Sequence, residues 1–104
     1  MRRGEIWYAS LERPRKSRPV LLLSRDEAYT RRTHVTVAPV TRTIRRIPVE
    51  VVVGPPDGLK LQSAVNLDDI QTIPIAQLDR RVTTLSPQKL NEVEAAIRFA
   101  LALR

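Results

Sequence analysis

Residues 20–23 form an unbroken apolar run, Val-Leu-Leu-Leu, that directly follows Arg18 and Pro19. A short run without polar alternation is typical of a strand that is buried on both faces. A charge beside such a strand is costly unless it has a partner, and proline does not pair in the middle of a sheet. We therefore predict that Arg18 sits at the mouth of this strand, in a place suited to holding an anion.

The rest of the chain reads as short β-strands separated by turns, without repeats, low-complexity segments or linkers. The predicted strands cover residues 4–10, 19–24, 34–40, 47–53, 63–67, 69–73 and 81–85. Two basic loops are expected at residues 11–18 and 41–46, one helical turn within residues 25–32, and a turn at 54–58. Pro48 favours an edge position for its strand. The pattern predicts a single domain, residues 1–104, that is mainly β and forms a small curved barrel.

A helix is expected after the last strand. Ser86 is a preferred N-cap residue, and Pro87 suits the first helical position. One face of this helix is apolar, with Leu90, Val93, Ile97, Ala100 and Leu101 at helical spacing. The sequence predicts that this face packs on the sheet.

Composition excludes several classes of site. The chain has no cysteine, which excludes a disulfide framework and thiolate zinc ligation. Its one histidine, His34, is expected to be a surface residue rather than a general base. Asp68 and Asp69 would face opposite sides of a strand, which disfavours a two-metal nuclease, so neither a metal nor a cofactor is expected. Without a long apolar run or a secretory segment, the expectation is a soluble cytoplasmic protein that does not contact a membrane.

The charge is strongly uneven along the chain. Residues 1–52 hold twelve basic and five acidic residues, whereas residues 53–104 hold six of each. Arginine predominates, which favours bidentate contacts to phosphate. The alternative for any single arginine is a solvated loop charge, and this is also the expectation for Arg80 and Arg81. The excess of basic residues in the first half of the chain, taken together, indicates a polyanionic partner.

Two strand ends carry the residues that we expect to act on such a partner. If the strands that contain Arg18 and Thr41 are neighbours, both residues border one groove with the basic loops as its walls. RNA can be cut without metal because its own 2′-hydroxyl attacks the phosphorus, and the protein must orient the phosphate and stabilise its charge. Arg18 suits charge stabilisation and Thr41 suits a hydrogen bond to the phosphate. The alternative for Thr41 is a loop cap.

Five segments in series resemble the MazF/PemK toxins of bacterial toxin–antitoxin systems, also called mRNA interferases. They are Arg3-Gly4-Glu5-Ile6-Trp7, Arg18-Pro19-Val20-Leu21-Leu22-Leu23-Ser24, Val37-Ala38-Pro39-Val40-Thr41, Asp68-Asp69-Ile70-Gln71-Thr72-Ile73 and Leu85-Ser86-Pro87. The resemblance covers residues 2–103 without a large gap.

The resemblance implies a homodimer of SH3-like barrels that cuts single-stranded RNA without metal, leaving a 2′,3′-cyclic phosphate and a 5′-hydroxyl, and that a cognate antitoxin silences. The family's catalytic arginine falls on Arg18, its phosphate-contacting threonine on Thr41, and its late acidic position on Asp68. The residues expected to contact RNA are Arg13, Lys16, Arg42, Arg45, Asn66 and Asp68.

Some positions depart from the family pattern. Asn66 stands where some members carry a second arginine, and Glu12 is only a candidate for a glutamate that others carry before Arg18. Asp68 is open to three roles: a general base, a reader of a base amino group, or a turn former. Trp7 and Tyr8 are expected to be structural.

Two rival functions remain on the sequence alone. Gyrase-poison toxins of the same fold grip a protein and have a tryptophan near the end of the last helix, which residues 99–104 lack. The other rival is a basic barrel that binds RNA without cutting it.

Overall fold

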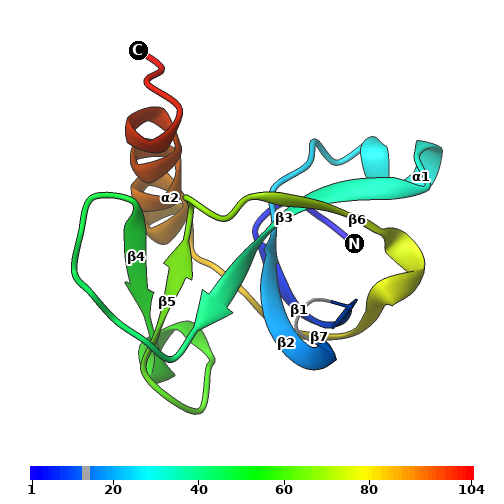
Figure 1. Ribbon diagram of the computed structural model, residues 1–104, viewed down its shortest axis with the longest axis horizontal. Helices are drawn as coiled ribbons and strands as arrows, with labels where there is room; N and C mark the ends of the chain where they lie inside the picture. The colour runs from blue at the N-terminus through cyan, green and yellow to red at the C-terminus, as the bar shows by residue number, and fades with distance from the viewer. Residues whose placement is uncertain (13–14) are drawn as a thin grey trace.

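The computed structural model describes residues 1–12 and 15–104, with the side chains of residues 11, 12, 15 and 16 left out of the description. Within these ranges the chain forms seven strands, two α-helices and two 3-10 turns (Figure 1). The strands are β1 (Glu5–Glu12), β2 (Arg15–Leu22), β3 (His34–Thr41), β4 (Glu50–Val53), β5 (Ser63–Asn66), β6 (Gln71–Pro74) and β7 (Leu78–Thr84). The helices are α1 (Ala28–Arg31) and α2 (Pro87–Ala100), and the 3-10 turns are η1 (Pro55–Asp57) and η2 (Ile75–Gln77).

The strands form one antiparallel sheet in the order β4-β5-β3-β2-β1-β7, and β6 pairs with the first half of β3. The expected fold class, mainly β with a C-terminal helix, is confirmed. The sheet is bent but not closed, because β4 and β7 end the strand order. Side chains link these two ends: Thr83 on β7 donates a hydrogen bond to the Asp57 carbonyl at 2.8 Å, and Lys89 on α2 donates to the Val52 carbonyl at 3.0 Å.

The apolar run of β2 is buried on both faces, as its composition predicts. Leu21 belongs to a core cluster that α2 covers, which we call the helix-side core. Val20 and Leu22 belong to a second cluster on the other face, which we call the α1-side core because α1 contributes to it. All three side chains have no exposed surface. β2 therefore runs between two cores, and it fixes the position of the residues that precede it.

The prediction of a basic loop at residues 11–18 is wrong. β1 and β2 continue as a paired hairpin through Glu12 and Arg15, so Arg18 lies inside β2, opposite Ala9, rather than at its mouth. Pro19 is accommodated because β3 pairs with β2 only over residues 20–22 and leaves one side of β2 free at this point. A strand can form here without apolar alternation in its sequence, because its backbone hydrogen bonds come from the partner strand.

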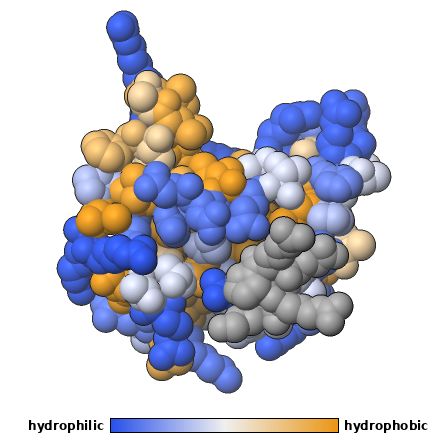
Figure 2. All heavy atoms as spheres, in the orientation of Figure 1, coloured by the Kyte–Doolittle hydropathy of each residue, from blue (hydrophilic) through white to orange (hydrophobic). Residues whose placement is uncertain are grey.

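The predicted helix is confirmed. The Ser86 hydroxyl accepts a hydrogen bond from the Lys89 amide at 3.1 Å, and Val93 and Ala96 are buried in the helix-side core. Leu101 is not on the buried face as expected: it is 56% exposed, because the helix ends at Ala100 and the chain turns away. Figure 2 shows apolar surface gathered over this helix.

Other predicted boundaries shift by a few residues. β4 begins at Glu50 rather than 47, which places Pro48 in the preceding turn, and β4 is an edge strand as expected. β7 begins at Leu78, three residues before its expected start. The helical turn expected within residues 25–32 is α1.

In the residues that the structure describes, neither helix is long and apolar enough to cross a bilayer.

Candidate functional site

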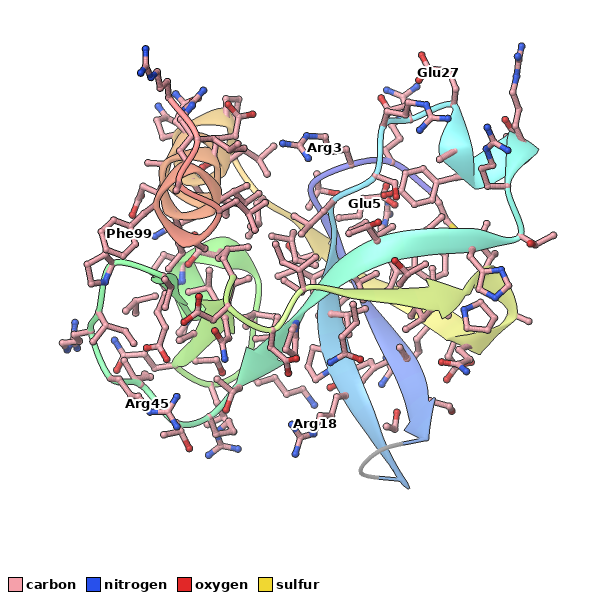
Figure 3. The ribbon with its side chains drawn as sticks, turned by 45° about the horizontal axis from the view of Figure 1, so that its top comes forward. Arg3, Glu5, Arg18, Glu27, Arg45 and Phe99 are labelled. Carbon is pink, nitrogen blue, oxygen red and sulfur yellow. The ribbon has the colours of Figure 1, made fainter. Side chains whose placement is uncertain are left out.

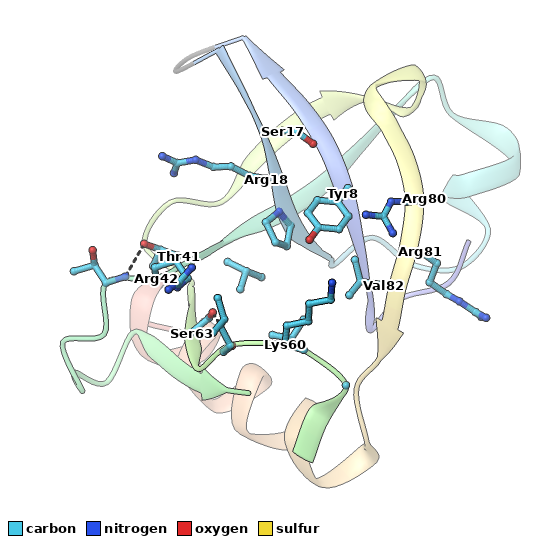
Figure 4. Close-up of a pocket in the computed structure, with 16 residues that line it drawn as sticks. Tyr8, Ser17, Arg18, Thr41, Arg42, Lys60, Ser63, Arg80, Arg81 and Val82 are labelled. Atoms are coloured by element: carbon cyan, nitrogen blue, oxygen red, sulfur yellow. Dashed lines mark hydrogen bonds between the residues drawn. The ribbon is translucent and has the colours of Figure 1, made fainter. Parts of the chain in front are cut away.

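A groove of about 710 Å³ lies between the β1–β2–β7 part of the sheet and the segment 58–63 that leads into β5 (Figure 4). Both Arg18 and Thr41 line it. β3 pairs with β2 at residues 37–39 and with β5 at residues 40–41, so Thr41 is carried past β2 to the floor of the groove. The structure therefore places Arg18 and Thr41, the two residues singled out in the sequence, along one groove.

The groove lining is cationic. Five of its residues carry a positive charge: Arg18, Arg42, Lys60, Arg80 and Arg81. Over the described part of the chain, no aspartate, glutamate or histidine belongs to the lining. Positive charges gathered in a cleft raise the local concentration of anions, and arginine matches phosphate geometry. The groove is thus built to attract a polyanion.

Arg18 is held at the groove by the backbone of β2. It is half-buried, it stands opposite Ala9 of β1, and it forms no ion pair with any carboxylate whose side chain is described. Figures 3 and 4 show its side chain extending away from the sheet. The guanidinium is therefore available to a ligand.

The loop-cap role considered for Thr41 is observed, and its contact with a phosphate stays a prediction. Its Oγ1 accepts a hydrogen bond from the Thr43 amide at 3.2 Å, which makes a side-chain-closed turn where β3 ends. A hydroxyl that accepts one bond still has its own proton to donate. The turn thus fixes the oxygen in place while leaving an O–H donor for a ligand oxygen.

The opposite side of the groove is formed by β1 and β7. Tyr8 stands opposite Arg80 in the sheet, and the Arg80 guanidinium carbon lies 4.5 Å from the centre of the Tyr8 ring. The neighbouring Arg81 is instead engaged by Glu5, with Nη1 3.6 Å from Oε2. Burial would raise the pKa of Glu5, but hydrogen bonds from the Trp7 indole and the Arg2 amide, with nearby positive charge, outweigh it and lower this pKa.

Several residues predicted to contact RNA lie elsewhere. Arg45 is engaged by Glu50, which accepts a hydrogen bond from the Arg45 amide at 2.8 Å and lies 3.6 Å from its guanidinium. Asn66 closes a turn by accepting a hydrogen bond from the Asp68 amide at 3.0 Å, and Asp68 is exposed. The groove lining includes none of these three residues.

Of the remaining predicted contacts, Arg42 lines the groove. Arg13 lies outside the described residues, and so do the side chains of Lys16 and of Glu12. Trp7 is structural, as expected: it packs against the α1-side core and donates its indole N–H to Glu5 at 2.9 Å.

Sequence reasoning missed Tyr8, Lys60 and Arg80 as members of the groove. Lys60 stands alone in a turn, and Arg80 reads as a solvated charge, so neither carries a local signal. A signal exists only in the pairing of β1 with β7, which a single sequence does not reveal. In the described ranges no three histidine, aspartate or glutamate side chains gather as metal ligands would.

Comparison with known proteins places these features in a family. Residues 2–101 match the family model described as "PemK-like, MazF-like toxin of type II toxin-antitoxin system". A curated relative from Mycobacterium tuberculosis, "Probable endoribonuclease MazF5", is 37% identical over 95% of this chain and 91% of its own length.

Two solved structures are similar along nearly the whole chain. The "Mycobacterium tuberculosis toxin MazF-mt6" has a TM-score of 0.89 at 38% identity and covers 96% of this chain and 98% of its own. An "Endoribonuclease in complex with its cognate antitoxin from Mycobacterial species" has a TM-score of 0.89 at 28% identity and covers 100% and 97% of the two chains.

Proposed function

The chain belongs to the PemK/MazF family of type II toxins, and from this premise we propose that it is a sequence-specific endoribonuclease that cleaves single-stranded mRNA in the cationic groove. Relatives of this chain are named endoribonucleases, which favours RNA cleavage over both rival functions. Those rivals are binding to a protein target and binding to RNA without cleavage. The observation that carries the proposal is that Arg18 and Thr41 line one groove whose described residues include no carboxylate.

The groove suits a cleavage in which RNA supplies the nucleophile. The 2′-hydroxyl attacks the adjacent phosphorus, the bond to the 5′-oxygen of the next nucleotide breaks, and the products are a 2′,3′-cyclic phosphate and a 5′-hydroxyl. Charge on the phosphoryl oxygens grows as the attack proceeds. A fixed cation and a fixed hydrogen-bond donor at these oxygens stabilise that charge more than they stabilise the bound substrate.

Arg18 is proposed to bind the phosphoryl oxygens and to stabilise their developing charge. A guanidinium keeps its proton in proteins, so it serves as an electrostatic group rather than as a proton donor. Thr41 is proposed to donate its hydroxyl proton to a phosphoryl oxygen, and its turn with Thr43 sets its direction in advance. Asp68 does not line the groove, so we assign it no part in proton transfer.

Arg42, Lys60 and Arg81 are proposed to hold the backbone on either side of the cleaved bond. They lie on different segments of the lining, so they contact phosphates at different points along the strand. Such contacts raise affinity without reading sequence. Arg13, Lys16, Arg45, Asn66 and Asp68 stay proposals as RNA contacts, and of these Arg45, Asn66 and Asp68 lie outside the groove lining.

The proposed partners follow from the family. They are single-stranded mRNA as substrate, a cognate antitoxin protein, as in the mycobacterial complex, and a second copy of this chain in a homodimer. We propose that the protein works in the cytoplasm, where mRNA is present.

The test is cleavage of a long mixed-sequence RNA by the purified protein in excess EDTA, with sequencing of the new 5′-hydroxyl ends. We expect cuts at one short recurring sequence, with no change when magnesium replaces EDTA. Activity that appears only with added magnesium would overturn the metal-free mechanism. Intact RNA under both conditions, with tight RNA binding, would show a binding protein instead.

A further inference from the structure

Tyr8 and Arg80 form a stacked pair on the side of the groove opposite Arg18. The register of β1 with β7 sets the two side chains opposite each other, and the guanidinium carbon lies 4.5 Å from the ring centre. Tyr8 is half-buried, whereas Arg80 is exposed. A planar cation held on an aromatic face is fixed in orientation and keeps its other face and its N–H edge open.

The neighbouring arginine shows that this stack is particular to Arg80. Arg81 follows it on β7, yet its guanidinium is drawn toward Glu5 at 3.6 Å. Figure 4 shows the Arg80 side chain over Tyr8 and that of Arg81 turned away from it. The salt bridges among described side chains include none to Arg80. Its planar group is thus held by an aromatic ring rather than by a carboxylate.

The position of the stack fits a nucleotide next to the cleaved bond. In Figure 4 Arg18 and Thr41 lie on one side of the groove, and Tyr8 and Arg80 lie on the other. The groove volume of about 710 Å³ falls within the range of sites that enclose a small organic ligand. A phosphate at Arg18 and Thr41 leaves room for an adjoining base to reach the far wall.

We propose that Tyr8 and Arg80 form a base-binding subsite, in which one unpaired nucleobase of the substrate stacks on the guanidinium that Tyr8 holds in place. This inference rests on the proposed endoribonuclease function, which it deepens by naming a positioning site for the substrate. Single-stranded RNA is commonly held by stacking of its bases on aromatic rings or on arginine planes. Arg80 fixes where the chain lies along the groove, and hence which phosphate meets Arg18.

The alternative is that Arg80 contacts a phosphate, as Lys60 and Arg42 are proposed to do. The two possibilities differ in what the contact requires of the substrate. A stacking contact requires the base and is lost when the base is removed. A phosphate contact is independent of the base.

The test uses single-turnover cleavage of an RNA oligonucleotide that contains the mapped cleavage sequence. Each nucleotide near the cut is replaced in turn by an abasic ribonucleotide, which keeps the phosphate and the 2′-hydroxyl. Wild type, Arg80→Ala and Tyr8→Leu are compared on every substrate, with Tyr8→Phe as a variant that keeps the ring. Arg31→Ala, which removes an exposed arginine of α1 outside the groove, is the matched control.

Removal of any base of the recognition sequence is expected to slow wild type, and at one position this loss, about 5- to 150-fold, comes from the stack on Arg80. Arg80→Ala shows that loss on the intact substrate and no further loss on the abasic one. Tyr8→Leu is slowed at the same position, and Tyr8→Phe is not. Arg31→Ala cleaves all substrates as wild type does.

Two results overturn the subsite. One is an Arg80→Ala variant that slows every substrate by the same factor, abasic ones included, which would indicate a phosphate contact. The other is a folded Arg80→Ala variant that cleaves as wild type on all substrates. Failure of the proposed function looks different, because wild type then cuts no RNA at all.

Discussion

Replacement of Arg18 by alanine tests the central proposal most directly. At about 4 Å and an effective dielectric constant of about 20, a guanidinium interacts with a full negative charge by about 4 kcal/mol. The attack on phosphorus adds roughly one such charge to the phosphoryl oxygens, so only part of this energy is already present in the bound substrate. Loss of one fixed donor to a developing oxyanion typically costs about 10²- to 10³-fold, or about 2.7–4 kcal/mol. We expect a fall in kcat of that size.

Binding and stability are expected to change little in Arg18→Ala. Four other cations line the groove and continue to hold the backbone, so KM rises modestly compared with the loss in kcat. Arg18 is half-buried and joins no described ion pair, so the free energy of unfolding stays within about 0.5 kcal/mol of wild type. Removing one like charge from a cationic groove also relieves repulsion.

The assay is single-turnover cleavage of an end-labelled oligonucleotide, run beside urea unfolding of each variant. Arg18→Lys keeps a charge but not the planar fork, so we expect intermediate activity. Arg31→Ala is the control for loss of an arginine elsewhere. A folded Arg18→Ala protein that retains kcat within threefold of wild type would refute the electrostatic role.

Four further predictions follow from other parts of the structure. Thr41→Val removes the hydroxyl donor and the turn with Thr43, and we expect cleavage to slow by about 10- to 100-fold with the fold intact, measured in the same assay; unchanged cleavage would leave Thr41 as a loop cap only. Lys60→Ala is expected to weaken RNA binding equally for all sequences. In a salt titration, the slope of log affinity against log salt should become shallower by about 0.7. A changed cleavage sequence would contradict a pure phosphate contact. The pKa of Glu5 is lowered in the fold, so its charge stabilises the protein above the ordinary pKa of a glutamate, and this contribution is lost as pH falls through the lowered value. Glu5→Gln should therefore lower Tm at pH 7 and lower it less at pH 3, and equal effects at both would show that the charge is not responsible. Leu21→Ala leaves a cavity at a fully buried position of β2 and is expected to cost about 2–5 kcal/mol in urea unfolding, an estimate that a loss below about 1 kcal/mol would contradict.

Several features could be predicted from the sequence because the chemistry that causes them is local. The run at residues 20–23 predicts a strand buried on two sides, and the structure places Leu21 in one core and Leu22 in the other. Ser86 and Pro87 predict a helix start, because one supplies a cap and the other loses no hydrogen bond there.

The hairpin arm was missed for an equally physical reason. The polarity of residues 11–18 carries no period of two that marks a strand, whereas the pairing of Leu11 and Glu12 with Arg15 and Lys16 depends on the partner strand. Leu101 was misplaced because helical periodicity gives the face of a residue but not the point at which the helix ends.

The residues of the candidate site also differ in whether the sequence near them gives a signal. Arg18 and Thr41 stand beside a recognisable strand run and a strand end, so their neighbourhood could be expected. Arg80, Tyr8 and Lys60 carry no local mark. They join the groove because β7 pairs with β1 and because the turn at Gly58 brings the next residues across from them.

The buried strand β2, the C-terminal helix and the excess of positive charge can be read from the amino-acid sequence alone, because burial, capping and net charge depend on residue types and on residues close together in the chain. Which cations meet in one groove follows from the folded chain instead, and so does their pairing with carboxylates: Arg81 lines the groove and also pairs with Glu5, whereas Arg45 pairs with Glu50 outside the lining. The physical reason is that strand pairing and register join residues far apart in sequence. A hydrophobic pattern that repeats about every two or four residues specifies the buried face of a strand or helix. It does not specify which strand pairs with it.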